Sequence, residues 1–107
     1  MRQLRPAELK EWLDDSNRPK PFLLDVREAW EFDRCRINGA ILFPMSQIQS
    51  TFTQLDPDQE TVVICHHGVR SFHVARFLEH NGFENVINLT GGVDAWAKEV
   101  DRTMPTY

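Results

Sequence analysis

Residues 61–72, TVVICHHGVRSF, change character halfway along. The first four residues are β-branched and suit a buried strand. Cys65 comes next and opens a polar turn that contains two histidines, Gly68 and Arg70. Beyond the turn, residues 71–81 place small and apolar side chains on one helical face. The stretch therefore predicts a strand, a cysteine-bearing turn and a helix.

The same alternation of short apolar runs and helical patterns extends in both directions. Strands are predicted at residues 22–24, 40–43, 61–64 and 85–89, helices at residues 6–15, 28–34, 46–55, 71–81 and 93–100, and an irregular tail at residues 101–107. Strands that are apolar throughout and separated by helices form parallel sheets covered on both faces. We therefore predict an α/β fold, with a single domain over residues 1–107, a central parallel β-sheet and helices on both faces.

The fold class also predicts where a ligand binds. In open parallel sheets, ligands occupy the crevice outside the carboxyl ends of the strands. Asp25 follows the apolar run at 22–24, and Cys65 follows the run at 61–64. We expect both side chains at this edge of the sheet.

Length, composition and charge exclude several classes of protein. The chain has 107 residues and a formal net charge of −4, which argues against general nucleic-acid binding. It has no apolar run of about 18 residues and no amino-terminal signal sequence, so we predict a cytoplasmic protein that does not enter membranes. Two cysteines, Cys35 and Cys65, are too few for a disulfide scaffold, and free thiols are expected.

The turn after Cys65 has the composition of an anion site. No Asp or Glu occurs from Thr61 to Leu78, whereas the same stretch contains two arginines and three histidines. A thiolate is the nucleophilic form of cysteine, and helix amino termini and nearby cations favour it. Gly68 lets the turn curl so that successive N–H groups point inward. We predict a bowl of amides, with the sulfur of Cys65 at its base and Arg70 or a protonated His66 or His67 adding positive charge.

Four motifs resemble those of single-domain rhodaneses, a family of sulfurtransferases. The segment Cys65-His66-His67-Gly68-Val69-Arg70-Ser71 is similar to the family's active-site loop C-x-x-G-x-R-[ST]. In the same order along the chain, LLDVRE at 23–28 with EF at 31–32, INGA at 37–40 with Pro44, and the closing GF, GG and Trp96 resemble the remaining family segments. The chain departs from the pattern at Arg36, where the family usually has histidine, and at Cys35, where glycine is common.

The resemblance implies a thiosulfate sulfurtransferase-type enzyme that works by covalent catalysis. Cys65 would take the sulfane sulfur of thiosulfate or a related persulfide, hold it as a persulfide and pass it to a thiol or to cyanide. The sulfur donor and acceptor would be small molecules, with a protein persulfide as the alternative donor, and neither a metal nor an organic cofactor is required. The remaining loop residues would bind the sulfur donor, namely His66, His67, Gly68, Val69, Arg70 and Ser71.

Some roles stay open at this point. Arg70 would attract a dianionic sulfur donor, and Ser71 would donate a hydroxyl hydrogen bond or cap the helix. Asp25 and Arg27 resemble the family's D-x-R pair, which supports the loop. A salt bridge that only stabilises the fold explains the pair equally well. Cys35 is either a resolving thiol or an incidental one.

Three other functions compete with sulfur transfer. A cysteine phosphatase loop has five residues between its cysteine and arginine, whereas four separate Cys65 from Arg70. Metal binding by Cys65, His66, His67 and His73 matches no common zinc spacing, and adjacent residues are expected to point in different directions. The third alternative is a non-catalytic binding module, which an intact cysteine loop disfavours.

Overall fold

The computed structural model describes residues 1–107 and contains a single five-stranded sheet. The strands run in the order β1-β5-β4-β2-β3, and all neighbouring pairs are parallel. Their bounds are Arg2–Leu4 for β1, Phe22–Asp25 for β2, Ile41–Leu42 for β3, Thr61–Ile64 for β4 and Val86–Leu89 for β5. The predicted α/β class with a central parallel sheet is confirmed.

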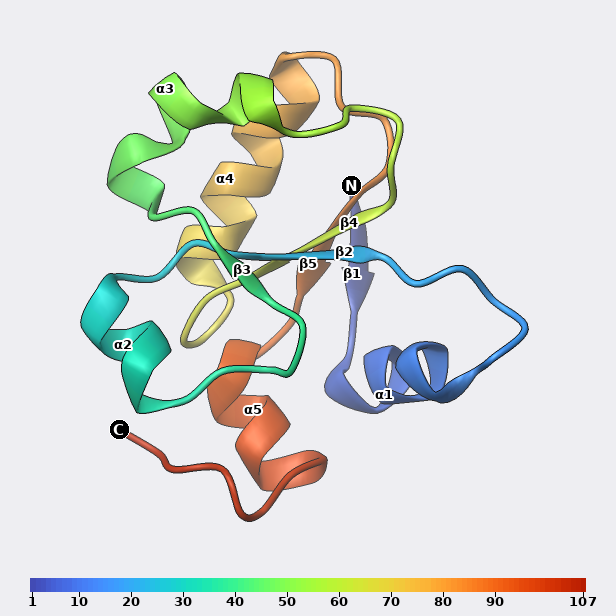
Figure 1. The fold of residues 1–107 in the computed structure, drawn as a ribbon, viewed down its shortest axis with the longest axis vertical. Helices are drawn as coiled ribbons and strands as arrows, with labels where there is room; N and C mark the ends of the chain where they lie inside the picture. Colours follow the sequence, from blue (N-terminus) through green and yellow to red (C-terminus); the bar gives the residue numbers. More distant parts are fainter.

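Helices cover both faces of the sheet, as predicted. Figure 1 shows α3 and α4 on one side of the strands and α1 and α5 on the other. The helices are α1 (Pro6–Asp14), α2 (Ala29–Arg34), α3 (Ile48–Thr51), α4 (Val69–His80) and α5 (Gly92–Glu99), and the 3₁₀ turns are η1 (Met45–Gln47) and η2 (Phe52–Gln54).

The core divides into two clusters because side chains alternate between the faces of a strand. In β4, Val62 and Ile64 join the cluster that contains Trp12 of α1 and Trp96 of α5. Val63 belongs to the other cluster, with the buried face of α4, and so does Cys65 directly after the strand. The strand period therefore directs the sulfur of Cys65 towards the face covered by α4.

Three elements differ from the sequence-based expectation. Strand β1 was not predicted, because only Leu4 of its three residues is buried, and it forms by pairing with β5. Helix α4 begins at Val69 rather than Ser71, because Gly68 adopts φ +97° and completes the turn by itself. Residues 46–55 are helical only in short pieces, with α3 lying between the two 3₁₀ turns.

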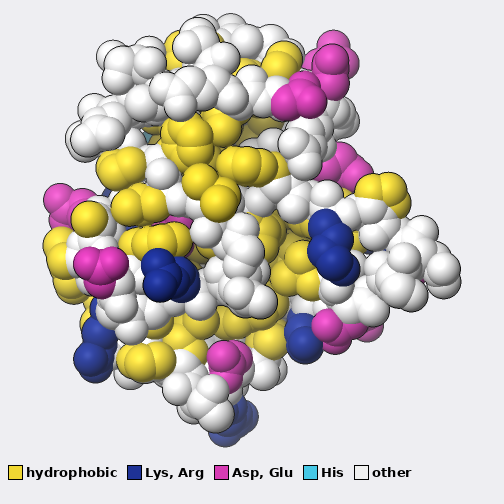
Figure 2. All heavy atoms as spheres, viewed as in Figure 1, with side chains coloured by type: hydrophobic (Ala, Val, Ile, Leu, Met, Phe, Trp, Pro, Cys, Tyr) yellow, Lys and Arg dark blue, Asp and Glu magenta, His cyan; other side chains and the backbone are white.

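Helix length and surface composition are the remaining features of the fold. None of the helices combines the length and the apolar character that a bilayer crossing needs. On the face where the edge strand β3 lies, Figure 2 shows hydrophobic side chains gathered near the middle, with isolated Lys and Arg among them. Ile41 of β3 is 49% exposed.

Candidate active site

Cys65 lies at the carboxyl end of β4, and its thiol is held by the residues that follow it. The side chain is only 1% exposed. The Gly68 N–H donates a hydrogen bond to the Cys65 Sγ at 3.0 Å, and the thiol donates to the Ser71 Oγ at 3.3 Å. Asp25 ends the paired strand β2, opposite Ile64. The structure therefore brings Asp25 and Cys65 to one edge of the sheet.

A buried asparagine organises the polar side of the thiol. Ser71 donates its hydroxyl proton to the Asn88 Oδ1 at 2.5 Å. The Asn88 amide in turn donates to the Gly68 carbonyl at 3.3 Å and to the Gln3 side chain at 2.9 Å. Ser71 does not cap α4, because Gly68 is the residue that precedes the helix. Its hydroxyl instead joins the sulfur of Cys65 to strand β5.

The amino terminus of α5 fixes the backbone of the loop. The Val93 N–H donates to the Cys65 carbonyl at 2.9 Å, and the Asp94 N–H donates to the His66 carbonyl at 3.0 Å. Gly92 makes this contact possible, because a Cβ at that position would lie 2.3 Å from the Cys65 carbonyl oxygen. The C=O and the following N–H of a trans peptide point in opposite directions. The N–H groups of His66 and His67 therefore face away from α5.

Several loop amides have no acceptor within the protein. The Gly68 N–H donates to the Cys65 Sγ, but the first-turn amides of α4 at Val69, Arg70 and Ser71 make no intramolecular hydrogen bond. Such groups carry the partial positive charge of a helix amino terminus. The loop thus places free N–H donors and one engaged N–H donor next to Cys65, which can accommodate a small anion.

The charge of Arg70 is already matched by an acidic residue from α2. Its two terminal nitrogens lie 2.7 and 2.8 Å from the two carboxylate oxygens of Glu31. These hydrogen bonds raise the pKa of Arg70 and lower the pKa of Glu31 to about 2. The loop has no acidic residue of its own, but the fold supplies one. The predicted free positive charge at Arg70 is therefore not present in the structure.

Asp25 and Arg27 form a buried ion pair behind the loop. Both side chains are fully buried, and the Arg27 Nη2 lies 2.7 Å from the Asp25 Oδ2. The guanidinium also donates to the Cys35 carbonyl at 2.6 Å and to the Tyr107 hydroxyl at 2.9 Å. Neither Asp25 nor Arg27 hydrogen-bonds to the Cys65 side chain. Through Arg27, the pair anchors the carboxyl end of α2 at Cys35 and also Tyr107, the residue that covers the loop.

Tyr107 covers the loop from the carboxyl-terminal tail, which Figure 1 shows running from α5 towards α2. Its ring stacks on His66 with a centroid distance of 3.8 Å. Its hydroxyl donates to the Glu31 Oε2 at 2.8 Å while accepting from Arg27. Burial raises the pKa of Tyr107 to about 12, so the hydroxyl keeps its proton near neutral pH. The tail is irregular, as predicted, but its last residue belongs to the site.

The two loop histidines lie against each other, contrary to the expectation that adjacent residues point apart. The rings of His66 and His67 are 3.9 Å apart at an angle of 33°, and one ligand atom from each lies within 4.8 Å of the Asp94 carboxylate. The two rings are tilted against each other, and the Asp94 carboxylate already pairs with Lys98 at 2.9 Å. Burial lowers the pKa of His66, so the predicted positive charge on this ring is absent at neutral pH.

The two departures from the rhodanese pattern have separate structural roles. Cys35 ends α2 as a buried, free thiol, and its carbonyl oxygen accepts from Arg27. Arg36 is exposed and places its guanidinium over the ring of Phe32, 4.6 Å from the ring centroid. Neither side chain hydrogen-bonds to a residue of the loop 65–71.

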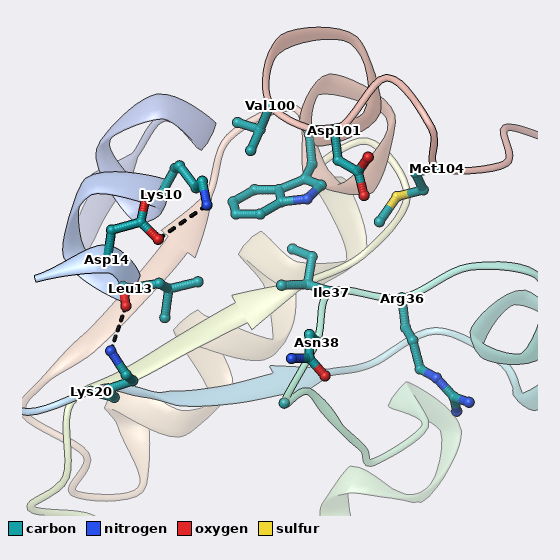
Figure 3. A pocket seen from close by; sticks show the side chains of 12 residues that line it. Lys10, Leu13, Asp14, Lys20, Arg36, Ile37, Asn38, Val100, Asp101 and Met104 are labelled. Atoms are coloured by element: carbon teal, nitrogen blue, oxygen red, sulfur yellow. Dashed lines mark hydrogen bonds and ion pairs between the residues drawn. The ribbon is translucent and has the colours of Figure 1, made fainter. Parts of the chain in front are cut away.

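A cavity of about 720 Å³ lies between α1, the connection before β3 and the end of α5, and none of its lining residues belongs to the loop 65–71. In Figure 3, Ile37 faces its interior, whereas the guanidinium of Arg36 points away from it. Its cations are partly engaged, because Lys10 pairs with Asp14 at 3.0 Å. The lining of this cavity includes no cysteine, so it lacks the nucleophile that Cys65 provides.

Sequence reasoning missed three residues of the site, namely Glu31, Asn88 and Tyr107. Asn88 carried a usable signal, since it is the one polar side chain within the otherwise apolar strand β5. Glu31 was noted as part of a motif, but nothing in the sequence connects it with Arg70, 39 positions away. Tyr107 gave no signal in a segment without a periodic pattern.

Comparisons with known proteins agree with this geometry. The sequence model of the Rhodanese-like domain matches residues 5–99. The putative sulfurtransferase YtwF of Bacillus subtilis is 35% identical over 99 residues, which cover 92% of this chain and 93% of YtwF. The probable adenylyltransferase/sulfurtransferase MoeZ of Mycobacterium tuberculosis is 38% identical over 106 residues, and the chain spans only about a quarter of its length, 26%.

Solved structures show the same architecture. The crystal structure of a rhodanese-like domain protein from Staphylococcus aureus superposes with a TM-score of 0.84 at 32% identity, covering 94% of this chain and 95% of that one. A rhodanese-related protein from Thermoplasma volcanium gives 0.83 at 31% identity, with 94% of each chain covered. The chain belongs to the Rhodanese-like domain family.

Proposed function

We propose that the protein moves a sulfane sulfur from thiosulfate or a related persulfide donor to a thiol or cyanide, with Cys65 as the carrier. The observation that supports this most is the position of the Cys65 Sγ. It accepts the Gly68 N–H at 3.0 Å at the start of a helix whose next three amides are free. Such donors stabilise an anion, and a persulfide places its negative charge one sulfur beyond Sγ.

The first half-reaction is a displacement at sulfur. The Cys65 thiolate attacks the outer sulfur of the donor, the S–S bond of the donor breaks, and the leaving group departs with the bonding electrons. With thiosulfate the leaving group is sulfite. In the second half-reaction, a thiol or cyanide attacks the outer sulfur of the persulfide and releases the Cys65 thiolate. No change of oxidation state at the protein remains after one cycle, and no metal or organic cofactor takes part.

The remaining loop residues have supporting roles in this proposal. The amides of Val69, Arg70 and Ser71 bind the outer sulfur, and the Gly68 amide holds Sγ. Because Cys65 is almost fully buried, only a donor that presents a narrow, one-atom terminus can reach it. His66 stacks on Tyr107, and His67 lies against His66, so the two histidines form one wall of the site. We place this chemistry in the cytoplasm, where a reducing environment keeps Cys35 and Cys65 as free thiols.

Two features of the structure argue against the alternative functions. A cysteine phosphatase uses its loop arginine to grip the phosphoryl group, whereas Arg70 is held by Glu31 in a two-point ion pair. A non-catalytic binding module needs no thiol, yet here three residues of two elements organise the sulfur of Cys65. Sulfur transfer is therefore the function that we propose.

The experiment is a rapid-mixing assay with excess thiosulfate and no acceptor. We expect one sulfite to be released per chain, followed by one thiocyanate per chain when cyanide is added. Cys65→Ser should release no sulfite, whereas Cys35→Ser should behave like the parent protein. A parent protein that releases no sulfite and gains no sulfur from any persulfide would contradict the proposal and favour the binding module.

A further inference from the structure

Each guanidinium near the loop is matched by its own carboxylate. Both terminal nitrogens of Arg70 contact both oxygens of Glu31, whose side chain is only 4% exposed. Arg27 pairs with Asp25 through its Nε and Nη2, and both of these side chains are fully buried. The planar fork of an arginine matches one carboxylate in this way and has little capacity for a second anion on the same edge.

Glu31 cannot easily leave Arg70, because other donors hold it in place. The Tyr107 hydroxyl donates to Oε2 at 2.8 Å, and the Glu28 N–H donates to Oε1 at 3.0 Å. Tyr107 is itself fixed by Arg27 and by its stack on His66. Freeing Arg70 for a substrate would break its two hydrogen bonds to a buried carboxylate. The pair is therefore a standing feature of the site.

This arrangement changes what the site attracts. The negative charge of Glu31 cancels the charge of Arg70, and a dianion next to the pair meets the carboxylate as well as the guanidinium. An apolar side chain lies on the α2 side of the pair, because Trp30, which precedes Glu31, is 59% exposed. The Trp30 ring lies edge-on against Tyr107 at 5.5 Å, which places it beside the loop.

We propose that the sulfur donor is the persulfide of an organic thiol, R–S–SH, and that Glu31 selects against dianionic donors such as thiosulfate. The inference rests on the proposed function, because it assumes that Cys65 accepts the sulfur. The Cys65 thiolate attacks the outer sulfur, the donor S–S bond breaks, and the product thiolate R–S⁻ leaves while Cys65 carries S–SH. The organic group R contacts Trp30, which thiosulfate has no group to reach.

The test counts charge in a series of four proteins. The parent, Glu31→Gln, Arg70→Ala and the double variant place a formal charge of zero, plus one, minus one and zero at the pair. The measurement is kcat/KM for thiosulfate divided by kcat/KM for cysteine persulfide, with thiocyanate formation as the common readout. Asp33→Asn is the control, because Asp33 lies on the same helix, is exposed and makes no ion pair or hydrogen bond.

In the parent, we expect cysteine persulfide to be the better donor. The ratio should rise by about tenfold or more in Glu31→Gln, because one unit charge at short range is worth at least that factor. It should fall in Arg70→Ala, return to the parent value in the double variant and stay unchanged in Asp33→Asn. If Glu31 and Arg70 had a merely structural role, their substitution would lower kcat/KM for both donors by the same factor, and the ratio would stay constant.

The outcomes separate the two proposals. A constant ratio across the series, or thiosulfate as the better donor in the parent, overturns the inference while leaving sulfur transfer intact. Failure of both donors to load Cys65 in the parent overturns the proposed function itself. If Glu31→Gln folds poorly, the comparison of Arg70→Ala with the double variant still decides, because neutralising Glu31 must then restore the ratio.

Discussion

Replacing Gly92 with alanine tests whether the amino terminus of α5 positions the catalytic loop. Gly92 has φ +56°, and an added Cβ would lie 2.3 Å from the carbonyl oxygen of Cys65 and 2.5 Å from that of His66. Real Cβ atoms do not approach closer than 3.0 Å, so one backbone segment must retreat by about 0.7 Å from the Cys65 carbonyl. The hydrogen bonds donated by Val93 and Asp94 are the contacts that lengthen.

The expected loss in the free energy of unfolding follows from these contacts. The left-handed backbone costs a non-glycine residue about 1–2 kcal/mol. Losing two backbone hydrogen bonds adds about 1 kcal/mol for each. We therefore expect Gly92→Ala to lower the free energy of unfolding by about 3–4 kcal/mol, and to slow the loading of Cys65 with sulfur because the loop amides shift with the backbone.

Gly39→Ala is the matched control. Gly39 has φ +91°, but an added Cβ would meet no atom within 4 Å. Its backbone strain is at least as large, because +56° lies nearer the left-handed minimum. The difference between the two variants in urea unfolding therefore measures the contact with the loop, at about 2 kcal/mol. Equal destabilisation of both variants, with unchanged loading of Cys65, would refute the reasoning.

Three further predictions concern the polar groups behind the loop. Asp25→Asn should lower the free energy of unfolding by about 3–5 kcal/mol, because Arg27 is left buried without its carboxylate, and the double variant with Arg27→Met should recover part of the loss in the same urea titration. Asn88→Leu should cost about 1–3 kcal/mol by leaving the buried Ser71 hydroxyl without an acceptor, and a double-mutant cycle with Ser71→Ala should show a coupling of about 1 kcal/mol; additive losses would mean that the bond contributes nothing. The lowered pKa of Glu31 stabilises the folded state above the ordinary carboxyl value of 4.5, and this contribution of up to about 3 kcal/mol should disappear as the pH falls from about 4.5 to about 2. Glu31→Gln should lack that part of the pH dependence, and identical pH profiles for parent and variant would contradict the assignment.

Local sequence patterns were sufficient to predict the sheet and the place of Cys65. The apolar run before Cys65 and the helical pattern after it are each confined to a few neighbouring residues, so they can be recognised without tertiary information. The same holds for Asp25 at the end of β2. These patterns also predicted the edge of the sheet at which the two residues meet.

Contacts between distant segments could not be predicted in this way. Strand β1 has two exposed residues and little apolar character, and it forms only because β5 offers an edge. Glu31 reaches Arg70 because α2 packs beside the loop, and Tyr107 reaches Glu31 across 76 positions. The charge of the loop was therefore overestimated from its own composition, because its neutralising carboxylate comes from another element.

The most direct test of the central claim is the mass of the peptide that contains Cys65 after the protein has been incubated with cysteine persulfide and freed of excess donor. We predict a gain of one sulfur atom on this peptide, removed by a reducing thiol and absent in Cys65→Ser. An unmodified Cys65 peptide, or a sulfur found only on the peptide of Cys35, would contradict the account.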